Sequence, residues 1–387
     1  MIIDFIGKFY DNHSLSIINR NLVLKLAELH PNWEISITPL DSYDPEYRVE
    51  KNVVKQLKVL EQVETGEPDI QLRHSYPPIW QWPASDRTKV VFIQPWEYTK
   101  APFEWQYKFE TFADALIVPS NFIGDTFRNA GLNPENLYVV PNGYDDQVFN
   151  TTEDNSDSDH IDGDRFNFVY VGNSQWRKGL DILMNSWKDS FKRSDKATLI
   201  IKDNPKIYGQ SNILDEIIKM QVKTGCSEII YINDDLSDKE MAAIFKSSDI
   251  VVHPYRAEGF GMHIQEAMAC GCIPLVSELG PTDDFVNADN GFKLPVSRKA
   301  VNITDANVFA MKPGDAMTGM STHTFYNEPN ADNLTNGIKM IYHSHNKAEE
   351  VYSKKDNMNM VNTWNKVVED YVSIFEQVSA RQNIVRY

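Results

Sequence analysis

The sequence predicts an α/β protein of two domains, each with a parallel sheet covered by helices on both faces. Three observations support this prediction. The chain has 387 residues, which is more than one hydrophobic core usually serves. Short strand-like apolar runs alternate with helical patterns, as they do in proteins with parallel sheets. A polar segment at 151–164 interrupts this alternation, which then restarts, so two similar domains are expected to face one cleft.

The first block consists of alternating strand and helix signals. Strands are predicted at residues 1–6, 34–38, 90–93, 115–118 and 137–140. A helix is predicted from Ser14, because apolar residues recur at helical spacing up to Leu29. Ser120 follows the fourth of these strands and stands where a helix N-cap is expected. We place the first domain at residues 1–155.

The second block begins after the polar segment. Residues 151–164 include one Ile and no other large apolar residue, so they cannot bury enough surface to pack and are interpreted as a linker or exposed loop. Strands are predicted at residues 166–172, 198–201, 229–232, 250–253 and 272–276. A helix opens at Ser237, because Glu240 stands at the spacing of a capping box. We place the second domain at residues 165–355.

The C-terminal part of the chain departs from this alternation. Residues 297–325 carry no strand-helix pattern and are interpreted as an inserted loop. Residues 332–342 and 359–375 have helical patterns and close the chain.

Composition and charge exclude several classes of protein. The formal net charge of −17 disfavours nucleic acid and anionic lipid as main partners, because both reward basic surfaces. No apolar run reaches the length of a transmembrane helix, and the N-terminus lacks the basic region of a signal peptide, so a cytoplasmic protein is expected. The three cysteines, Cys226, Cys270 and Cys272, have no metal-like spacing and are interpreted as buried, reduced thiols.

The segment 255–276 carries the strongest functional signal. It follows an apolar strand, and Gly259 and Gly261 permit a tight turn and a close approach of the backbone to a ligand. A helix is predicted from Gly261, so free N–H groups and the helix dipole would form an anion site suited to a diphosphate. Glu258 on the loop and Glu266, eight residues later, could hold hydroxyl groups at the two ends of an elongated ligand.

A second signal lies at the start of the second domain. Arg177 and Lys178 stand on a loop between a predicted strand and a predicted helix, just before Gly179. Two cations at such a place can neutralise a pyrophosphate, which is the leaving group when a sugar is transferred from a nucleotide sugar. The alternative is a solvated Arg-Lys pair on the surface.

The segment around Glu258 and Glu266 resembles the Glu-x7-Glu motif of the family-4 retaining glycosyltransferases, the bacterial group 1 type, which have the GT-B fold of two Rossmann-like domains. The resemblance implies that Glu258 contacts the hydroxyls of the donor sugar and Glu266 those of the ribose. It also implies that the turn at Gly259 and the amides of Phe260, Gly261 and Met262 hold the diphosphate.

The resemblance extends to the loop before Gly179. Lys178 matches the lysine with which the family binds the donor phosphate, and Arg177 stands beside it. The family often has an arginine after the preceding glycine, where this chain has Asn173, and Arg177 is a candidate to compensate. The resemblance thus implies that Glu258 and Lys178 are the catalytic residues.

The N-terminal half resembles the family more loosely. Many relatives have a second glycine after Gly7, close to the donor phosphate, whereas this chain has Lys8. Many also carry His or Asp after the strand at 90–93, where Glu97 is the nearest ionisable residue. Gly7 and Glu97 are therefore candidates for contact with the acceptor or the donor, and the alternative for Glu97 is a structural carboxylate.

The implied activity is transfer of a hexose, with retention of configuration, from a UDP- or GDP-hexose to a glycan, lipid-linked glycan or protein hydroxyl, as in polysaccharide biosynthesis. No metal or other cofactor is expected. The chain would be cytoplasmic, with attachment to the membrane periphery through the acceptor as a further option, and residues 359–387 would pack back onto the first domain. The alternatives are a catalytically silent GT-B binding subunit and a GT-B nucleotide-sugar epimerase.

Overall fold

The computed structural model describes all residues of the chain except 153–160, 209–211, 303–322, 346–348, 359–361 and 382–387. The described residues form two compact units. The first contains Met1–Gly143 together with the C-terminal helix, and the second begins at Tyr144.

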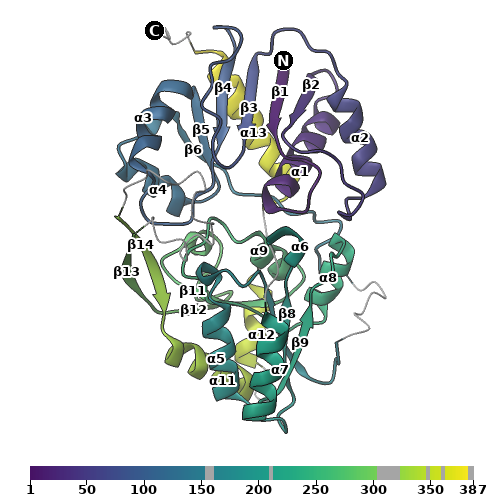
Figure 1. Cartoon of the computed structure of the whole chain (residues 1–387), viewed down its shortest axis with the longest axis vertical. Coiled ribbons are helices and arrows are strands. Elements are labelled where there is room, and N and C mark those ends of the chain that lie inside the picture. The colour runs from purple at the N-terminus through teal and green to yellow at the C-terminus, as the bar shows by residue number, and fades with distance from the viewer. Residues whose placement is uncertain (153–160, 209–211, 303–322, 346–348, 359–361, 382–387) are drawn as a thin grey trace. The chain divides into compact units, whose positions relative to one another are not determined.

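The first unit contains a six-stranded parallel sheet in the order β2-β1-β3-β4-β5-β6 (Figure 1). Every residue of β4 and β5 is buried, as expected where helices cover both faces of a parallel sheet. The elements of this unit are β1 (Ile2–Gly7), α1 (Ser14–Leu29), β2 (Glu34–Pro39), α2 (Lys51–Glu61), β3 (Ile70–His74), β4 (Lys89–Ile93), α3 (Phe103–Phe112), β5 (Ala115–Val118), α4 (Asn121–Asn129), η1 (Pro134–Asn136), β6 (Leu137–Val139) and α13 (Trp364–Ser379).

Local capping signals define where the helices of the first unit begin. Helix α1 begins at Ser14 as predicted, and the side chain of His13 accepts a hydrogen bond from the N–H of Leu15. Ser120 is the N-cap of α4, also as predicted, and its hydroxyl accepts from the N–H of Ile123 at 3.3 Å.

The C-terminal helix α13 belongs to the first unit, where it packs against α1. A Cβ added at Gly143 would lie 2.5 Å from the Trp364 ring, so the end of the first unit packs closely on the start of this helix. Beyond the helix, Arg381 donates to Asn136 Oδ1 at 2.6 Å and to the Tyr138 hydroxyl at 2.7 Å. The predicted return of the last helix to the first domain is confirmed.

The sequence analysis missed strand β3. In its sequence, polar Gln71 and Arg73 alternate with Ile70 and Leu72, yet Arg73 is buried. The Arg73 guanidinium donates to the backbone oxygens of Ile79 and Gln81 and to the side chain of Gln71. A buried cation is tolerated here because these acceptors replace water, and such pairing is not visible in the sequence.

The second unit contains a six-stranded parallel sheet in the order β12-β11-β10-β7-β8-β9. Its elements are β7 (Phe166–Val171), η2 (Trp176–Lys178), α5 (Leu180–Ser190), β8 (Ala197–Lys202), α6 (Pro205–Tyr208), α7 (Ile213–Thr224), β9 (Glu228–Ile232), α8 (Asp238–Lys246), β10 (Ile250–His253), α9 (Met262–Ala269), β11 (Ile273–Ser277), η3 (Pro281–Asp284), β12 (Phe292–Leu294), β13 (Val296–Asn302), β14 (His323–Pro329), α11 (Ala331–His345) and α12 (Glu349–Asp356).

This sheet separates two hydrophobic clusters, one on each face. Phe168 and Val252 pack into the first cluster, with helices α5 and α11, whereas Val169 and Val251 pack into the second, with α8 and α9. Neighbouring residues of a strand belong to different clusters because successive side chains point to opposite faces of the sheet. Helix α8 begins at the predicted capping box, and the three cysteines are buried and form no disulfide bond, as predicted.

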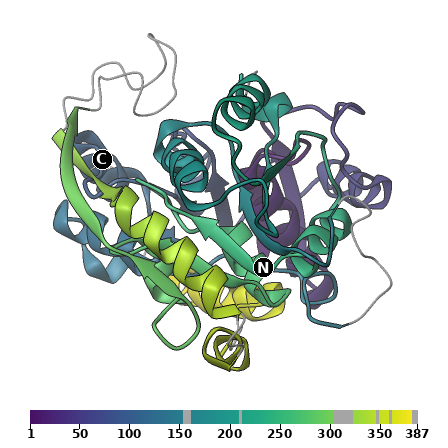
Figure 2. The ribbon, with the colours of Figure 1, turned by 90° about the horizontal axis from the view of Figure 1, so that it is seen from below.

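The interpretation of residues 297–325 as an inserted loop is wrong at both ends. Strands β13 and β14 pair in antiparallel register, from Val296 opposite Pro329 to Asn302 opposite His323. Figure 2 shows this hairpin in green and yellow-green as a ribbon separate from the six-stranded sheet. The middle of the segment, residues 303–322, lies outside the described part of the chain. Sequence reasoning missed the two strands because these twenty residues separate them, so no short turn signal joins them.

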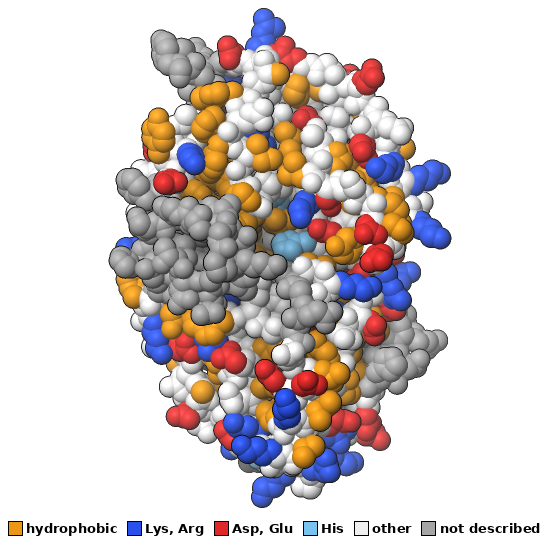
Figure 3. Space-filling model, in the orientation of Figure 1, with side chains coloured by type: hydrophobic (Ala, Val, Ile, Leu, Met, Phe, Trp, Pro, Cys, Tyr) orange, Lys and Arg blue, Asp and Glu red, His pale blue; other side chains and the backbone are white. Residues whose placement is uncertain are grey.

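The surface agrees with the mixed composition. Acidic and basic side chains are interspersed over the face shown in Figure 3. Among the described residues, no helix combines the length and the apolar character needed to cross a bilayer.

Candidate functional site

The order of strands in the second sheet reverses between β7 and β10. The chain builds outward from β7 through β8 and β9 on one side, and through β10, β11 and β12 on the other. Because β7 and β10 pair in parallel, their carboxyl ends lie at the same edge. Ligands of such sheets bind outside the carboxyl ends at the point of reversal. The two predicted motifs follow these two strands.

Hydrogen bonds join the turn after β7 to the loop after β10. The carbonyl of Arg177 accepts from the N–H of Arg256 at 2.7 Å and from that of Ala257 at 3.2 Å. In return, Arg177 Nη1 donates to the carbonyl of Ala257 at 3.2 Å. A Cβ added at Gly179, whose φ is +75°, would lie 1.9 Å from the Pro254 carbonyl oxygen, so only glycine permits this approach.

Glu258 lies at the centre of this junction and is buried. Lys178 Nζ donates a hydrogen bond to its Oε2 atom, and Arg177 Nη1 lies 4.0 Å from the same oxygen. The N–H of Gly259 donates to Oε1 at 3.0 Å. The structure therefore brings three predicted site residues together, although 80 positions separate Lys178 from Glu258 in the sequence.

The charges of this cluster keep Glu258 ionised. Burial by itself raises the pKa of the carboxyl group, but Lys178, the His253 imidazole and Arg177 together hold this pKa well below its ordinary value. Two cationic side chains face one carboxylate, which leaves one net positive charge. The cluster can therefore accept a further anion.

Two histidines complete the cluster, and the sequence analysis did not single them out. His253 is fully buried, with Nε2 3.7 Å from Glu258 Oε2 and its ring stacked on Tyr170. The His263 ring meets it edge to face, with 4.4 Å between centroids. Burial lowers the pKa of His253 to about 4, and it also lowers that of His263, so both rings are neutral at pH 7. The sequence did offer a signal for both residues: His253 is the last residue of the strand β10, and His263 lies in the first turn of α9, so both are close to the predicted donor site.

The start of α9 provides backbone donors. Gly261 adopts a φ of +94° as the residue before the helix, which begins at Met262. Within the described part of the chain, the N–H groups of Phe260, Gly261 and Met262 find no hydrogen-bond acceptor, as is normal for the first turn of a helix. Backbone donors at the start of a helix can bind an anion, which is the role that the sequence predicts for them.

Glu266 lies on α9 and is partly exposed. No side-chain hydrogen bond or ion pair of Glu266 is found among the described residues. Burial, together with the negative charge of Asp238 on α8, raises the pKa of Glu266 to about 8. The two glutamates therefore differ: Glu258 is ionised and paired, whereas Glu266 is largely protonated at neutral pH.

The remaining two candidates, Gly7 and Glu97, lie in the first unit. A Cβ added at Gly7 would lie 2.5 Å from Asn19 Nδ2 and 2.9 Å from the His74 carbonyl oxygen. Gly7 thus leaves room for Asn19, whose Oδ1 lies 2.6 Å from His74 Nδ1 at the end of β3. Glu97 is half-buried near Tyr76. The pKa of the Tyr76 phenol is raised, mainly by the burial of Tyr76 itself and to a smaller extent by the negative charge of Glu97.

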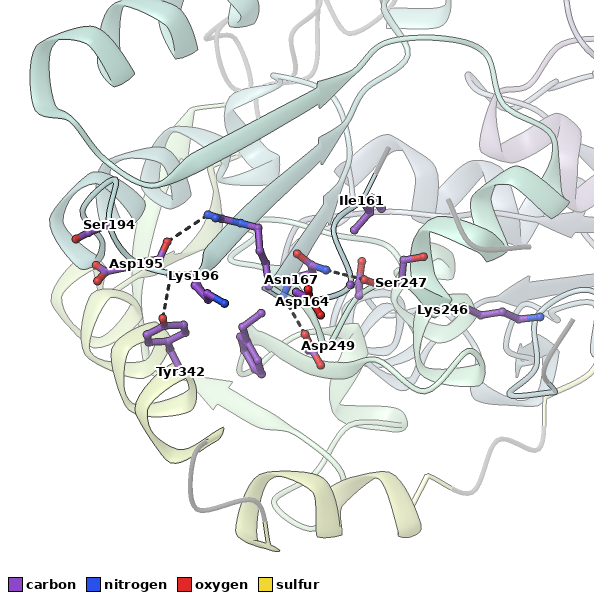
Figure 4. A pocket seen from close by; sticks show the side chains of 14 residues that line it. Ile161, Asp164, Asn167, Ser194, Asp195, Lys196, Lys246, Ser247, Asp249 and Tyr342 are labelled. Carbon is purple, nitrogen blue, oxygen red and sulfur yellow. Dashed lines mark hydrogen bonds between the residues drawn. The ribbon is translucent and has the colours of Figure 1, made fainter. Parts of the chain in front are cut away.

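A cavity of about 720 Å³ opens at the opposite edge of the second sheet (Figure 4). Its lining includes Arg165, Lys196 and Asp249, which immediately precede β7, β8 and β10. Asn167 donates to the carbonyl of Ser247 at 3.0 Å across its wall. The cavity therefore lies at the amino ends of the strands and contains none of the predicted site residues.

Over the described ranges, no group of three or more His, Cys, Asp or Glu side chains is arranged to hold a metal ion.

Comparison with known proteins identifies two family models along the chain. The model described as "Glycosyltransferase Family 4" matches residues 45–148, and the one described as "Glycosyl transferases group 1" matches residues 151–305. The second match includes the turn after β7, the loop after β10 and helix α9.

Curated relatives match over part of their length. The MMP alpha-(1->4)-mannosyltransferase of Mycolicibacterium hassiacum is 26% identical over 178 residues, which are 46% of this chain and 39% of the relative. The GDP-mannose-dependent alpha-mannosyltransferase of Corynebacterium glutamicum is 26% identical over 206 residues, which are 51% of this chain and 44% of the relative. The match thus spans less than half of either relative.

Solved structures match over nearly the whole chain. Anabaena HepE in complex with UDP-glucose has a TM-score of 0.65 at 15% identity, covering 97% of this chain and 100% of that chain. The sucrose-phosphate synthase of Thermosynechococcus elongatus has a TM-score of 0.66 at 14% identity, covering 98% and 99%. At these identities the likeness establishes the fold.

Proposed function

The chain belongs to the family-4, group 1 glycosyltransferases with the GT-B fold, and we propose that it transfers a hexose from a nucleotide sugar to the hydroxyl group of an acceptor. The donor would be a UDP- or GDP-hexose. Both nucleotides occur among the similar proteins, in the UDP-glucose complex of HepE and in the GDP-mannose-dependent enzyme of Corynebacterium glutamicum.

The observation that carries this proposal is the cluster of Arg177, Lys178 and Glu258 at the point where the strand order of the second sheet reverses. The cluster has a net positive charge, and unpaired N–H groups begin helix α9 along the same loop. A diphosphate is an anion that can bind both kinds of group at once. The site is therefore suited to a nucleotide diphosphate even though the whole chain is acidic.

The two glutamates take different parts of the donor in this proposal. Glu258 is ionised, fixed by Lys178 and by the N–H of Gly259, and its position beside the cations suits the sugar hydroxyls next to the diphosphate. Glu266 lies about one turn along α9 and has no side-chain partner in the described part of the chain, which suits the ribose hydroxyls. A carboxyl group without a partner gains a hydrogen bond when such a ligand arrives.

The proposed reaction proceeds with retention by attack on the front face of the sugar. The acceptor oxygen bonds to the anomeric carbon as the bond from that carbon to the diphosphate breaks, and the acceptor proton passes to the leaving phosphate oxygen. Lys178 and Arg177 would stabilise the charge that develops on this phosphate, and Glu258 the positive charge on the sugar ring. Because cationic side chains and amides supply the positive charge, the reaction is proposed to need no metal ion.

The family indicates three classes of acceptor for the proposed reaction. A glycan, a lipid-linked glycan or a protein hydroxyl would each serve, with a role in polysaccharide biosynthesis. Gly7 and Glu97 at the carboxyl edge of the first sheet remain proposed contacts for the acceptor or donor.

A panel of nucleotide sugars tests the proposal. The purified chain is incubated with UDP- and GDP-linked hexoses, with and without EDTA, and nucleotide release is measured together with binding of free UDP and GDP. Release from one donor, dependent on an added glycan acceptor, is the expected result. A chain that binds neither nucleotide and releases none from any donor would contradict the proposal.

A further inference from the structure

We propose that Arg256 is a positioning residue for the donor site, which it ties to the β13–β14 hairpin. The inference rests on the proposed function of the site. Arg256 is two residues before Glu258 and is buried, and its contacts join three segments that lie far apart in the sequence.

All five N–H groups of the Arg256 guanidinium have acceptors. Nη1 donates to the carbonyl of Trp176 and to Asp181 Oδ1, both at 2.7 Å. Nη2 donates to Asp181 Oδ2 at 2.8 Å and to Glu328 Oε1 at 3.1 Å, and Nε donates to Glu328 Oε2 at 3.0 Å. The planar fork thus holds a carboxylate on each of two sides, which a lysine cannot do.

These bonds fix the backbone that carries Lys178. The Arg256 side chain holds the carbonyl of Trp176, and its N–H group holds the carbonyl of Arg177 at 2.7 Å. The guanidinium also lies over the Trp176 ring, 4.4 Å from its centroid. Two successive carbonyls directly before Lys178 are therefore bound to the same residue, on the loop that carries Glu258.

The hairpin supplies the other side of this arrangement. Glu328 on β14 binds the guanidinium, and the N–H of the neighbouring Asn327 donates to the carbonyl of Arg256 at 2.9 Å. The Tyr326 ring meets the Trp176 ring edge to face at 4.6 Å. Three successive residues of β14 thus contact Arg256 or the turn after β7, so the hairpin is a structural part of the donor site.

A positioning role for Arg256 and a general contribution of Arg256 to folding predict different effects on nucleotide affinity and on the melting temperature. Phosphate binding requires Lys178 and Arg177 to point at the ligand, and small displacements of such groups weaken binding and slow transfer. Loss of Arg256 should therefore raise the dissociation constant for nucleotide and the KM for donor in the folded protein. A merely structural role would lower the melting temperature and leave the folded molecules with normal affinity.

The test uses the full chain with Arg256→Lys, Glu328→Gln and Asp181→Asn, and with Arg298→Ala as a matched control, because Arg298 is an exposed arginine on the same hairpin. UDP and GDP binding is measured by calorimetry, donor KM and kcat by nucleotide release, and folding by thermal melts. For Arg256→Lys we expect the dissociation constant and KM to rise about tenfold, the size expected for loss of one charged hydrogen bond. Glu328→Gln and Asp181→Asn each keep one acceptor oxygen but lose the negative charge and one hydrogen bond to the guanidinium. Each should show a smaller rise of about threefold.

The outcomes separate this inference from the proposed function. A wild-type chain that binds no nucleotide overturns the proposed function, and this inference with it. A wild-type chain that binds nucleotide, with Arg256→Lys binding it within twofold, overturns the positioning role alone. If Arg256→Lys does not fold, Glu328→Gln and Asp181→Asn decide: raised dissociation constants support the role, and unchanged ones overturn it.

Discussion

Replacing Glu266 by glutamine should stabilise the protein at alkaline pH, and replacing it by alanine should weaken the binding of nucleotide. Burial and the neighbouring Asp238 raise the pKa of this carboxyl group from 4.5 to about 8 in the folded protein. Below pH 4.5 the group is protonated in both the folded and the unfolded chain. Between pH 4.5 and 8 the unfolded chain ionises first, so the free energy of unfolding of the wild type falls as pH rises.

The size of this effect follows from the difference between the two pKa values. At about 1.4 kcal/mol for each pH unit, the interval from 4.5 to about 8 gives an upper limit of about 5 kcal/mol. The side chain is partly exposed, and solvent reduces the penalty, so we expect about 1–2 kcal/mol. Glutamine cannot ionise, so Glu266→Gln should be more stable than the wild type by that amount at pH 9 and equal to it at pH 4.

The assay is urea unfolding at pH 4, 7 and 9, with nucleotide affinity measured at pH 7. Glu216→Gln is the control, because Glu216 is an exposed carboxylate on α7 of the same unit. Glu266→Ala removes the hydrogen-bonding group altogether. Because Glu266 is largely protonated at pH 7, this variant should weaken nucleotide binding by about 0.5–1.5 kcal/mol, the range for a neutral hydrogen bond. Equal stability of wild type and Glu266→Gln at pH 9 would refute the electrostatic reasoning. Unchanged nucleotide affinity of Glu266→Ala would refute the ribose contact.

Three further predictions concern the cluster after β7 and β10. Glu258→Gln should reduce turnover about a hundredfold, a loss of about 3 kcal/mol, with free nucleotide bound as well as before or better because Lys178 loses its carboxylate partner. Retained turnover with lost nucleotide binding would reverse the roles of the two glutamates. Chelation by EDTA should leave nucleotide affinity unchanged if cationic side chains replace a metal, and a large loss would count against this. Gly179→Ala should lower the free energy of unfolding by at least about 2 kcal/mol, because its Cβ would meet the Pro254 carbonyl at 1.9 Å, whereas Gly163→Ala, with open space around it, should not.

Much of the fold could be predicted because the signals are local. The strand β10 and the helix α8 follow from an apolar run and from a capping box, both of which lie within a few residues. The turn at Gly261 and the helix after it follow in the same way. Strand β3 was missed because its alternating polar residues are satisfied by partners elsewhere in the fold, such as the carbonyls that bind Arg73.

The sequence by itself determined the α/β class, the family resemblance and the two loops that carry Arg177, Lys178 and Glu258, since each rests on residue types at short spacing. Only the tertiary structure decided that Lys178 binds Glu258, that His253 lies beside them, and that Arg256 ties the loop to Glu328 of the hairpin. These contacts depend on the parallel pairing of β7 with β10 and on the antiparallel pairing of β13 with β14. Such pairings join segments far apart in the chain, and no local pattern of residues specifies which segments meet.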